Sequence, residues 1–286
     1  MKTRIFVVTS VVCICALIAM GQSKKRPSPS PTPASTWDSY EGVKWQKGAS
    51  VGTLGDIAQV KVPEGFVFAG ANDTRLIMEA NQNPTNGREL GFVAPADENW
   101  FAVFEFDDVG YVKDDDKDSL DANALLESIK QGTEAGNKER MRRGWATMTI
   151  VGWEQPPHYN DITHNLEWAV KATSEGFPVV NHNTRMLGRG GVMEVTLVTD
   201  PTKLTETLPK FKTMLQGFEF KQGQRYAEFR AGDKTAAYGL TGLIVGGAGA
   251  ALVKTGAFKW LWKALVGAAV GVSALVKKLF SRNRTA

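Results

Sequence analysis

The sequence has few of the side chains on which metal sites and nucleophilic catalysis depend. It contains two cysteines, Cys13 and Cys15, and both lie in the first apolar segment. It contains three histidines, and none belongs to an HExxH motif or to another recognised zinc-ligand spacing. We find no G-x-S-x-G motif, and no S-x-x-K motif after the first apolar segment. The sequence therefore predicts no metal, no cofactor and no catalytic residue.

Acidic residues are missing from both ends of the chain. The stretch from Asp38 to Lys234 holds all 30 acidic residues against 22 Lys and Arg, so its net charge is −8. The two ends are purely basic. This distribution is typical of basic segments next to a membrane around an acidic soluble domain. It excludes nucleic acid as the expected partner, because phosphate would be repelled.

Residues 1–21 are predicted to be a signal peptide. Two basic residues precede an apolar run from Ile5 to Ala19, which is shorter than the roughly 20 residues of a membrane-spanning helix. The small residues Ala19 and Gly21 place the cleavage directly after residue 21. An uncleaved segment that stays in the membrane is the alternative. Residues 22–36 form a Pro/Ser-rich linker, which we expect to be extended.

Residues 236–286 are predicted to be a C-terminal transmembrane anchor with a basic tail. Two runs rich in Gly and Ala, 236–253 and 264–276, flank a basic segment that contains two tryptophans, a residue typical of membrane interfaces. One crossing keeps the seven basic residues of the tail in the cytoplasm, and two crossings are the alternative. We therefore expect a protein of the cytoplasmic (inner) membrane whose main domain lies on the periplasmic, extracytoplasmic side.

Each apolar run of the predicted anchor contains a pair of glycines four residues apart. The pairs are Gly242 with Gly246 and Gly267 with Gly271. Such pairs let two helices approach closely in lipid, which predicts a helical hairpin or a homo-oligomer formed through the anchor. A Gly-rich apolar segment also produces these pairs by chance, so packing is a prediction from composition.

Residues 37–235 are predicted to form an exported α+β domain, an antiparallel sheet with helices packed on it. Short turns join four strand-like runs into a meander: 146–153, 164–172, 177–186 and 192–199. Amphipathic helices are expected at 74–80, after 118–119 and over 202–216. A last strand pair is expected at 218–220 and 226–229. We expect Pro209 to kink or divide the third helix.

Asp114 and Asp116 are the first binding candidates. They belong to an acidic run with carboxylates at alternate positions, as in a calcium loop, but Ser119 and Leu125 stand where that loop requires Gly and Glu. Carboxylates in front of a helix also stabilise its N-terminus, and Asp118 with Asp121 resembles a capping box. The helix-end role therefore accounts for most of the run.

Trp153, Arg185 and Arg189 are the other binding candidates. Trp153 lies at a strand end and is expected to be exposed or packed in the core. The two arginines flank the turn 188–191, where they would bind an acidic partner, be solvated or pair with nearby carboxylates. The turn itself lacks the GK[ST] ending of a phosphate loop and is expected to be a hairpin whose glycines adopt positive φ.

Several short segments of the sequence together resemble the membrane-anchored bacterial proteins of domain of unknown function 2167. They are Val62-Pro63-Glu64-Gly65-Phe66, Gly110-Tyr111-Val112-Lys113-Asp114, Val151-Gly152-Trp153, Asn183-Thr184-Arg185 with Leu187-Gly188-Arg189, and Gly232-Asp233-Lys234 leading to Ala237-Tyr238-Gly239-Leu240. The resemblance runs from about residue 40 to the end and implies a signal, an envelope domain and a C-terminal anchor. The order of elements is also similar to that of PsbP- or Mog1-like domains, an analogy of fold only.

The sequence favours a membrane-anchored envelope protein whose exported domain binds an envelope protein or assists assembly. The tether, the acidic domain and the missing catalytic motifs support this hypothesis. The alternative is a hydrolase or small-ligand-binding domain whose site is assembled from scattered acids and a histidine: Asp107, Asp114 and Asp116 near His164.

Overall fold

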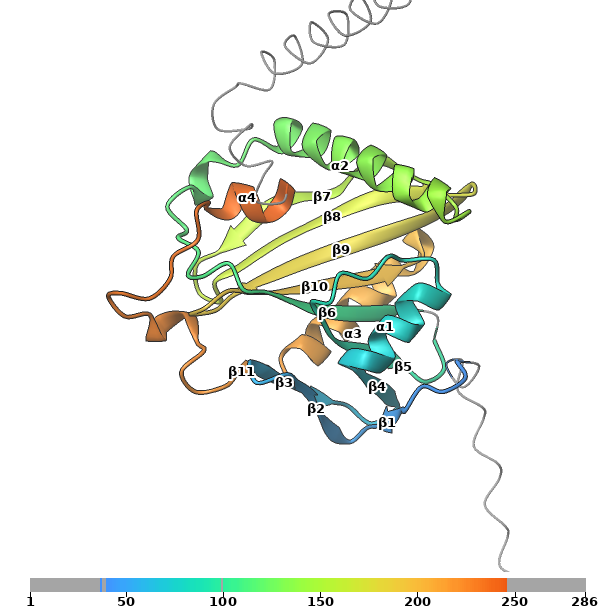
Figure 1. Cartoon of the computed structure of the whole chain (residues 1–286), viewed down its shortest axis with the longest axis horizontal. Helices are drawn as coiled ribbons and strands as arrows, with labels where there is room; N and C mark the ends of the chain where they lie inside the picture. The colour runs from blue at the N-terminus through green and yellow to red at the C-terminus, as the bar shows by residue number, and fades with distance from the viewer. Residues whose placement is uncertain (1–36, 38–39, 99, 246–286) are drawn as a thin grey trace, which may run out of the picture. The chain divides into compact units, whose positions relative to one another are not determined.

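The computed structural model describes residues 37, 40–98 and 100–245 (Figure 1). The predicted signal peptide and the whole Pro/Ser-rich linker, residues 22–36, lie outside this part of the chain. The same holds for residues 246–286 of the predicted anchor. In the described ranges, no helix has the length and apolar character needed to cross a membrane. The anchor over 236–286 therefore stays a prediction.

A large antiparallel sheet of eight strands organises the domain. In spatial order its strands are β1 (Gln46–Lys47), β4 (Phe66–Gly70), β5 (Glu89–Pro95), β6 (Phe101–Asp107), β10 (Val192–Thr199), β9 (Phe177–Leu187), β8 (Asn165–Ser174) and β7 (Met148–Asn160). β7 to β10 form a meander in chain order, as the alternating runs and short turns predict. The predicted α+β class is confirmed.

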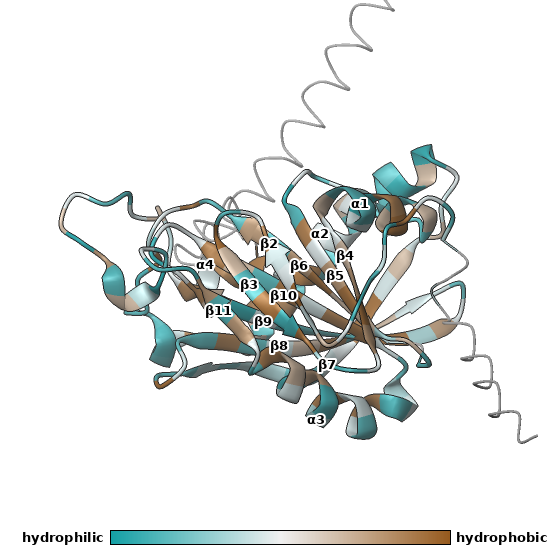
Figure 2. Cartoon of the chain, turned by 90° about the horizontal axis from the view of Figure 1, so that it is seen from below, coloured by the Kyte–Doolittle hydropathy of each residue, from teal (hydrophilic) through white to brown (hydrophobic). Residues whose placement is uncertain are grey.

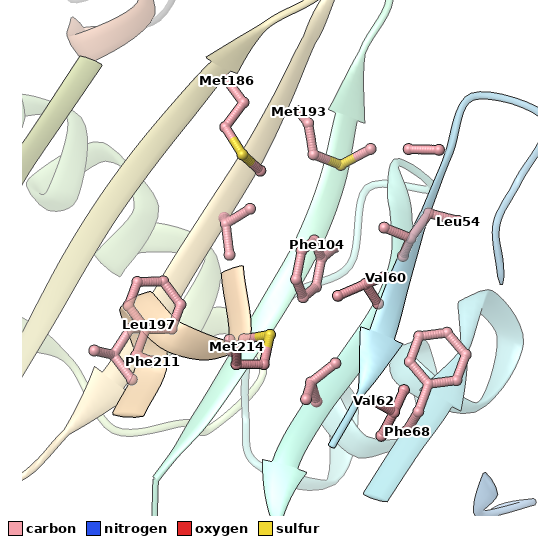
Figure 3. Packing of buried hydrophobic residues seen from close by; sticks show 14 of the residues in the cluster. Leu54, Val60, Val62, Phe68, Phe104, Met186, Met193, Leu197, Phe211 and Met214 are labelled. Carbon is pink, nitrogen blue, oxygen red and sulfur yellow. The ribbon is translucent and has the colours of Figure 1, made fainter. Parts of the chain in front are cut away.

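One face of the large sheet is covered by helix α3 (Leu204–Leu215) and by a second, three-stranded sheet. This small sheet has the order β11 (Phe218–Phe220), β3 (Ala58–Val62) and β2 (Ser50–Leu54). We call the covered side the α3 face. Alternate residues of β10, among them Met193 and Leu197, point into it and pack with Phe104 and with Phe211 of α3 (Figure 3). The largest apolar cluster of the described residues lies here.

The opposite side, the α2 face, carries the other helices, which are α1 (Ala71–Ala80), α2 (Ala122–Arg142) and α4 (Leu240–Val245). α1 packs over β4 and β5 (Figures 1 and 2), and α2 packs along β7 (Figure 1). α4 lies beside the first turns of α2, and its Leu240, Leu243 and Ile244 join an apolar cluster with Trp168 of β8. The described beginning of the predicted anchor is thus part of the domain core.

Two local predictions differ from the structure. The residues predicted as the last strand form a 3-10 helix, Tyr226–Glu228, because the Glu228 carboxylate accepts hydrogen bonds from the backbone N–H groups of Gly223 and Arg225 and closes the turn. Pro209 does not divide α3, which runs unbroken from Leu204 to Leu215 after a separate 3-10 turn at Pro201–Lys203.

Candidate functional site

A band of polar side chains crosses the middle strands on the α2 face, between the areas covered by α1 and α2. Glu105 of β6, Glu194 of β10 and Arg185 of β9 lie side by side in the antiparallel register, because Glu194 pairs with both of the others. At the next position on the same face, Thr196 of β10 donates a hydrogen bond to the Asn183 side chain of β9 at 3.2 Å. The sheet therefore carries its charged and amide groups in one row, which we call the polar band.

Arg185 is the most deeply buried charge of the polar band. Its side chain is 10% exposed, and Nη2 lies 3.4 Å from Oε2 of Glu194. The guanidinium stacks over the Trp168 ring at 4.7 Å from the ring centroid. Nε and Nη1 are shielded from solvent and have no hydrogen-bond partner. Burial lowers the pKa of Arg185, and Glu194 offsets part of that effect.

The acidic members of the polar band are bound to a different arginine. Arg88 lies 3.2 Å from Asp107, 3.7 Å from Glu194 and 4.0 Å from Glu105. Burial and the neighbouring Glu194 raise the pKa of Glu105. Arg88 contacts all three carboxylates, whereas Arg185 contacts only Glu194 and keeps two side-chain nitrogens, Nε and Nη1, without a hydrogen-bond partner.

A cavity of about 250 Å³ opens next to Arg185, between α2 and the sheet. Its polar wall is formed by β9 through Asn181, Asn183 and Arg185, with Trp168 of β8 beside them. Its other walls are mostly apolar and come from four elements: Ile129 and Thr133 of α2, Met148 and Ile150 of β7, Val170 of β8 and Ile244 of α4. A concave apolar space with one buried cation is suited to an anionic group attached to an apolar body.

Asp116 holds the helix that supplies Ile244. Its carboxylate accepts hydrogen bonds from the backbone N–H of Leu240 at 2.8 Å, from that of Thr241 at 3.2 Å and from the Thr241 hydroxyl at 2.8 Å. The residue therefore caps α4, which is 124 positions away in the chain. The prediction that the acidic run serves the N-terminus of α2 was wrong for Asp116, and the cap of α2 is Asp121 alone.

Asp114 lies close to His164, as the alternative hypothesis required, but Asp107 and Asp116 do not join them. The Tyr159 hydroxyl donates to Asp114 at 2.9 Å and lies 3.1 Å from Nδ1 of His164, which is itself 4.0 Å from Asp114. Burial and the Asp114 hydrogen bond raise the pKa of Tyr159. Asp107 contacts Arg88 and Asp116 caps α4, so the three acids of the alternative site have three separate roles.

Trp153 and Arg189 have structural partners. The indole N–H of Trp153 donates to the Ala122 carbonyl at 3.1 Å, which ties β7 to the start of α2. Arg189 forms a two-pronged ion pair with Asp233, with both N–O distances at 2.7 Å. It does not line the cavity of Arg185. Arg185, which precedes the glycine turn, is thus buried, whereas Arg189, which lies within the turn, is paired with Asp233.

The turn at residues 188–191 needs glycine for space and not for positive φ. Positive φ is found at other glycines of the described chain, and Gly188, Gly190 and Gly191 do not adopt it. A Cβ on Gly191 would lie 2.2 Å from the Asp107 carbonyl oxygen, so only glycine allows the turn to pack against the end of β6. The predicted hairpin is present, and the predicted reason for its glycines was wrong.

The predicted packing glycines are divided by the limits of the described chain. Gly242 lies in α4, where a Cβ would meet the Tyr238 ring 2.3 Å away, so the small residue lets that ring pack against the helix. Gly246, Gly267 and Gly271 lie outside the described residues. Their role in helix packing stays a prediction.

Sequence reasoning identified Arg185 but missed its surroundings. Asn181, Asn183 and Arg185 alternate with residues of the opposite face along one strand, so a polar wall was readable from period 2 once the sheet was assumed. Trp168 and Ile244 come from distant segments, and no local pattern connects them with Arg185. His182, buried on the α3 face with neither ring nitrogen hydrogen-bonded, was also missed.

The chain belongs to the family described as "Protein of unknown function (DUF2167)", which matches residues 46–277. Among solved structures it is similar to cyanobacterial PsbP (CyanoP) from Synechocystis sp. PCC 6803, with 10% identity, a TM-score of 0.36, and 68% of this chain and 96% of that chain covered. It is also similar to PA94, a protein of unknown function from Pseudomonas aeruginosa, with 13% identity, a TM-score of 0.25, and 58% and 93% covered. Similarities this weak do not indicate a shared function. No protein with a curated description matches.

Proposed function

We propose that this member of the DUF2167 family is a membrane-anchored envelope protein whose exported domain is a binding module and not an enzyme. The basic, apolar ends around an acidic domain support export and anchoring. The bound component carries an anionic group, which Arg185 recognises in the cavity under α2. The proposal rests on one observation, the buried guanidinium of Arg185, a residue that lines that cavity and has two side-chain nitrogens without a hydrogen-bond partner.

The energetic cost of Arg185 favours a role in binding. A buried donor without a partner costs about 1–3 kcal/mol of folding free energy. Replacing a buried ion pair by apolar side chains of similar size is often neutral or stabilising. A domain that keeps such an arginine is therefore less stable than it could be, which is typical of functional sites. An anion at the guanidinium would offset the cost.

A small ligand fits this site better than a folded protein partner. A specific protein interface needs about 800 Å² from each side. Arg185 lies instead in the lining of an open pocket of about 250 Å³ between α2 and the sheet. The hydrolase alternative is weakened, because Asp107, Asp114 and Asp116 contact three different partners and do not converge on one pocket.

Native mass spectrometry on the full-length protein, released from the membrane of the cells that make it, tests the proposal. We expect a small-molecule adduct on the wild type that is lost in Arg185→Met. Arg189→Met is the matched control, because it removes a neighbouring arginine that is paired with Asp233 and lies outside the cavity. Equal adducts on all three proteins, or none on the wild type, would contradict the proposal.

Chemical denaturation separates binding from a structural role. Arg185→Met alone leaves Glu194 with only Arg88, so the informative variant is the double change Arg185→Met with Glu194→Gln. We expect its free energy of unfolding to be unchanged or raised by about 1–2 kcal/mol. A loss of about 3 kcal/mol or more would mean that the arginine serves the fold.

A further inference from the structure

The cavity beside Arg185 has two chemically different halves. The β9 side offers a guanidinium and two amide side chains, and the side formed by α2, β7 and α4 offers aliphatic groups. The charges around Arg185 are mostly acidic, because the carboxylates of Glu194, Glu105 and Asp107 act on it and are opposed by one cation, Arg88. A singly charged anion meets less repulsion there than a dianion such as phosphate. The polar half therefore suits a monocarboxylate.

The apolar half limits the size and shape of what is attached to that carboxylate. A volume of about 250 Å³ corresponds to roughly eight groups the size of a water molecule. Ile129, Ile150 and Ile244 project into it from three different elements. An apolar body of a few carbon atoms, for example a short alkyl chain, fits such a space.

We propose that the cavity binds an amphipathic monocarboxylate with a small apolar body such as a short alkyl chain, and that this ligand strengthens the docking of α4. The inference rests on the anion recognition proposed above and adds the ligand class and its link to the C-terminal segment. The carboxylate lies at Arg185, and the chain packs against Ile244. α4 is the last described element before the predicted anchor, so occupancy of the cavity is coupled to the docking of the segment that leads there.

α4 is docked on the domain with five of its six residues buried, and a ligand in the cavity would add to the contacts that hold it there. The helix has six residues, and Asp116 is its N-terminal cap. Its apolar contacts are to the cluster around Trp168 and α2. A ligand that touches Ile244 adds to these contacts only when α4 is docked, so binding and docking stabilise each other by the same factor.

The ligand class is tested with alkyl carboxylates on the full chain in lipid nanodiscs, with Trp fluorescence as the readout. Butanoate, hexanoate and octanoate are compared with the alcohols of the same length, which partition into lipid but carry no charge. We expect affinity to rise about fourfold for each added methylene. We expect each carboxylate to bind at least tenfold more tightly than its alcohol, and Arg185→Met to remove that difference.

The link to α4 is tested by hydrogen exchange of residues 240–245 in the same nanodiscs. Octanoate at ten times its Kd is expected to slow these amides about tenfold. Asp116→Asn should speed their exchange without ligand, and Asp115→Asn, the same change at an exposed neighbour, should not. Ile244→Ala should weaken octanoate severalfold and leave butanoate unchanged, because only the longer chain reaches that side chain.

The outcomes separate the two proposals. If no carboxylate binds the wild type better than Arg185→Met, both the anion site and this inference are wrong. If carboxylates bind at Arg185 but chain length has no effect, the anion site stands and the ligand class is wrong. If octanoate binds and the exchange of α4 does not change, or Ile244→Ala weakens butanoate equally, the link to the C-terminal segment is wrong.

Discussion

The two faces of the large sheet are built from the same strands and differ in chemistry. On the α3 face, Phe104, Met193 and Leu197 meet Phe211 in a continuous apolar layer (Figure 3). On the α2 face, the apolar areas under α1 and α2 are separated by the polar band with Arg185. Residues that are neighbours in sequence, such as Phe104 and Glu105, belong to opposite faces.

This difference indicates that one face mainly stabilises the fold and the other serves binding. Apolar burial contributes most of the favourable free energy of folding, so the α3 face stabilises the domain. The polar band contributes less, because the attraction between its charges is offset by the cost of removing them from water. A face that is less optimised for stability is where we place binding.

The largest expected difference comes from neighbouring residues of β6. Phe104 is fully buried, and Phe104→Ala should lower the free energy of unfolding by about 3–5 kcal/mol, because it removes a ring and leaves a cavity. Glu105→Gln should change it by about 1 kcal/mol or less, because the lost attraction to Arg88 is offset by relief of the repulsion from Glu194. Urea unfolding of both variants measures this difference, and equal losses of unfolding free energy would contradict it.

The second test uses His182, a titratable residue buried within the α3 face beside Phe211. Burial lowers its pKa to about 4, while Glu167 opposes this effect and Lys212 and His158 add to it. The unfolded chain takes up the proton near pH 6.5 and the folded chain only near pH 4. The stability that this residue supports is therefore present above about pH 6.5 and is lost as the pH falls towards 4.

The loss is expected to be about 3 kcal/mol, from the size of the pKa difference. His182→Leu should remove this part of the pH dependence and leave the protein more stable than the wild type at pH 5. His158→Gln, a change at a half-exposed histidine next to the same Glu167, should keep most of the loss, because His158 contributes less to the pKa shift than burial, Glu167 and Lys212. Denaturation midpoints between pH 4 and 7 measure this, and identical profiles for His182→Leu and the wild type would contradict it.

The smallest expected effect concerns the paired arginine, Arg189, and sharpens the contrast with Arg185. The hydrogen bonds from Arg189 and from the Arg230 backbone lower the pKa of Asp233 to about 2. Because the folded value lies below the ordinary one near 3.9, the contribution is present above about pH 4 and is lost as the pH falls to 2. Asp233→Asn should thus lower the unfolding midpoint slightly at pH 5, and a difference that persists unchanged at pH 2 would argue against this pair.

Much of the fold was predictable because its pattern is local. The alternation of apolar and polar residues in 164–172, 177–186 and 192–199 predicts three strands, and the structure contains β8, β9 and β10 there. The segment Tyr226–Glu228 was mispredicted, because a carboxylate that closes a turn overrides a short apolar pattern. The site was predicted only in part. The sequence indicated Arg185 as a cation next to a turn, but it did not indicate that this arginine is buried.

The sequence by itself determined the sorted charges, the apolar ends, the membership of the family and the α+β class, because composition and period 2 are carried by consecutive residues. Only the tertiary structure decided which arginine is buried and which is paired, and that Asp116 caps a helix 124 positions away. It also brought Trp168 and Ile244 to the same cavity. The physical reason is that burial and long-range hydrogen bonds depend on strand order and helix packing, and these join segments that no local pattern relates.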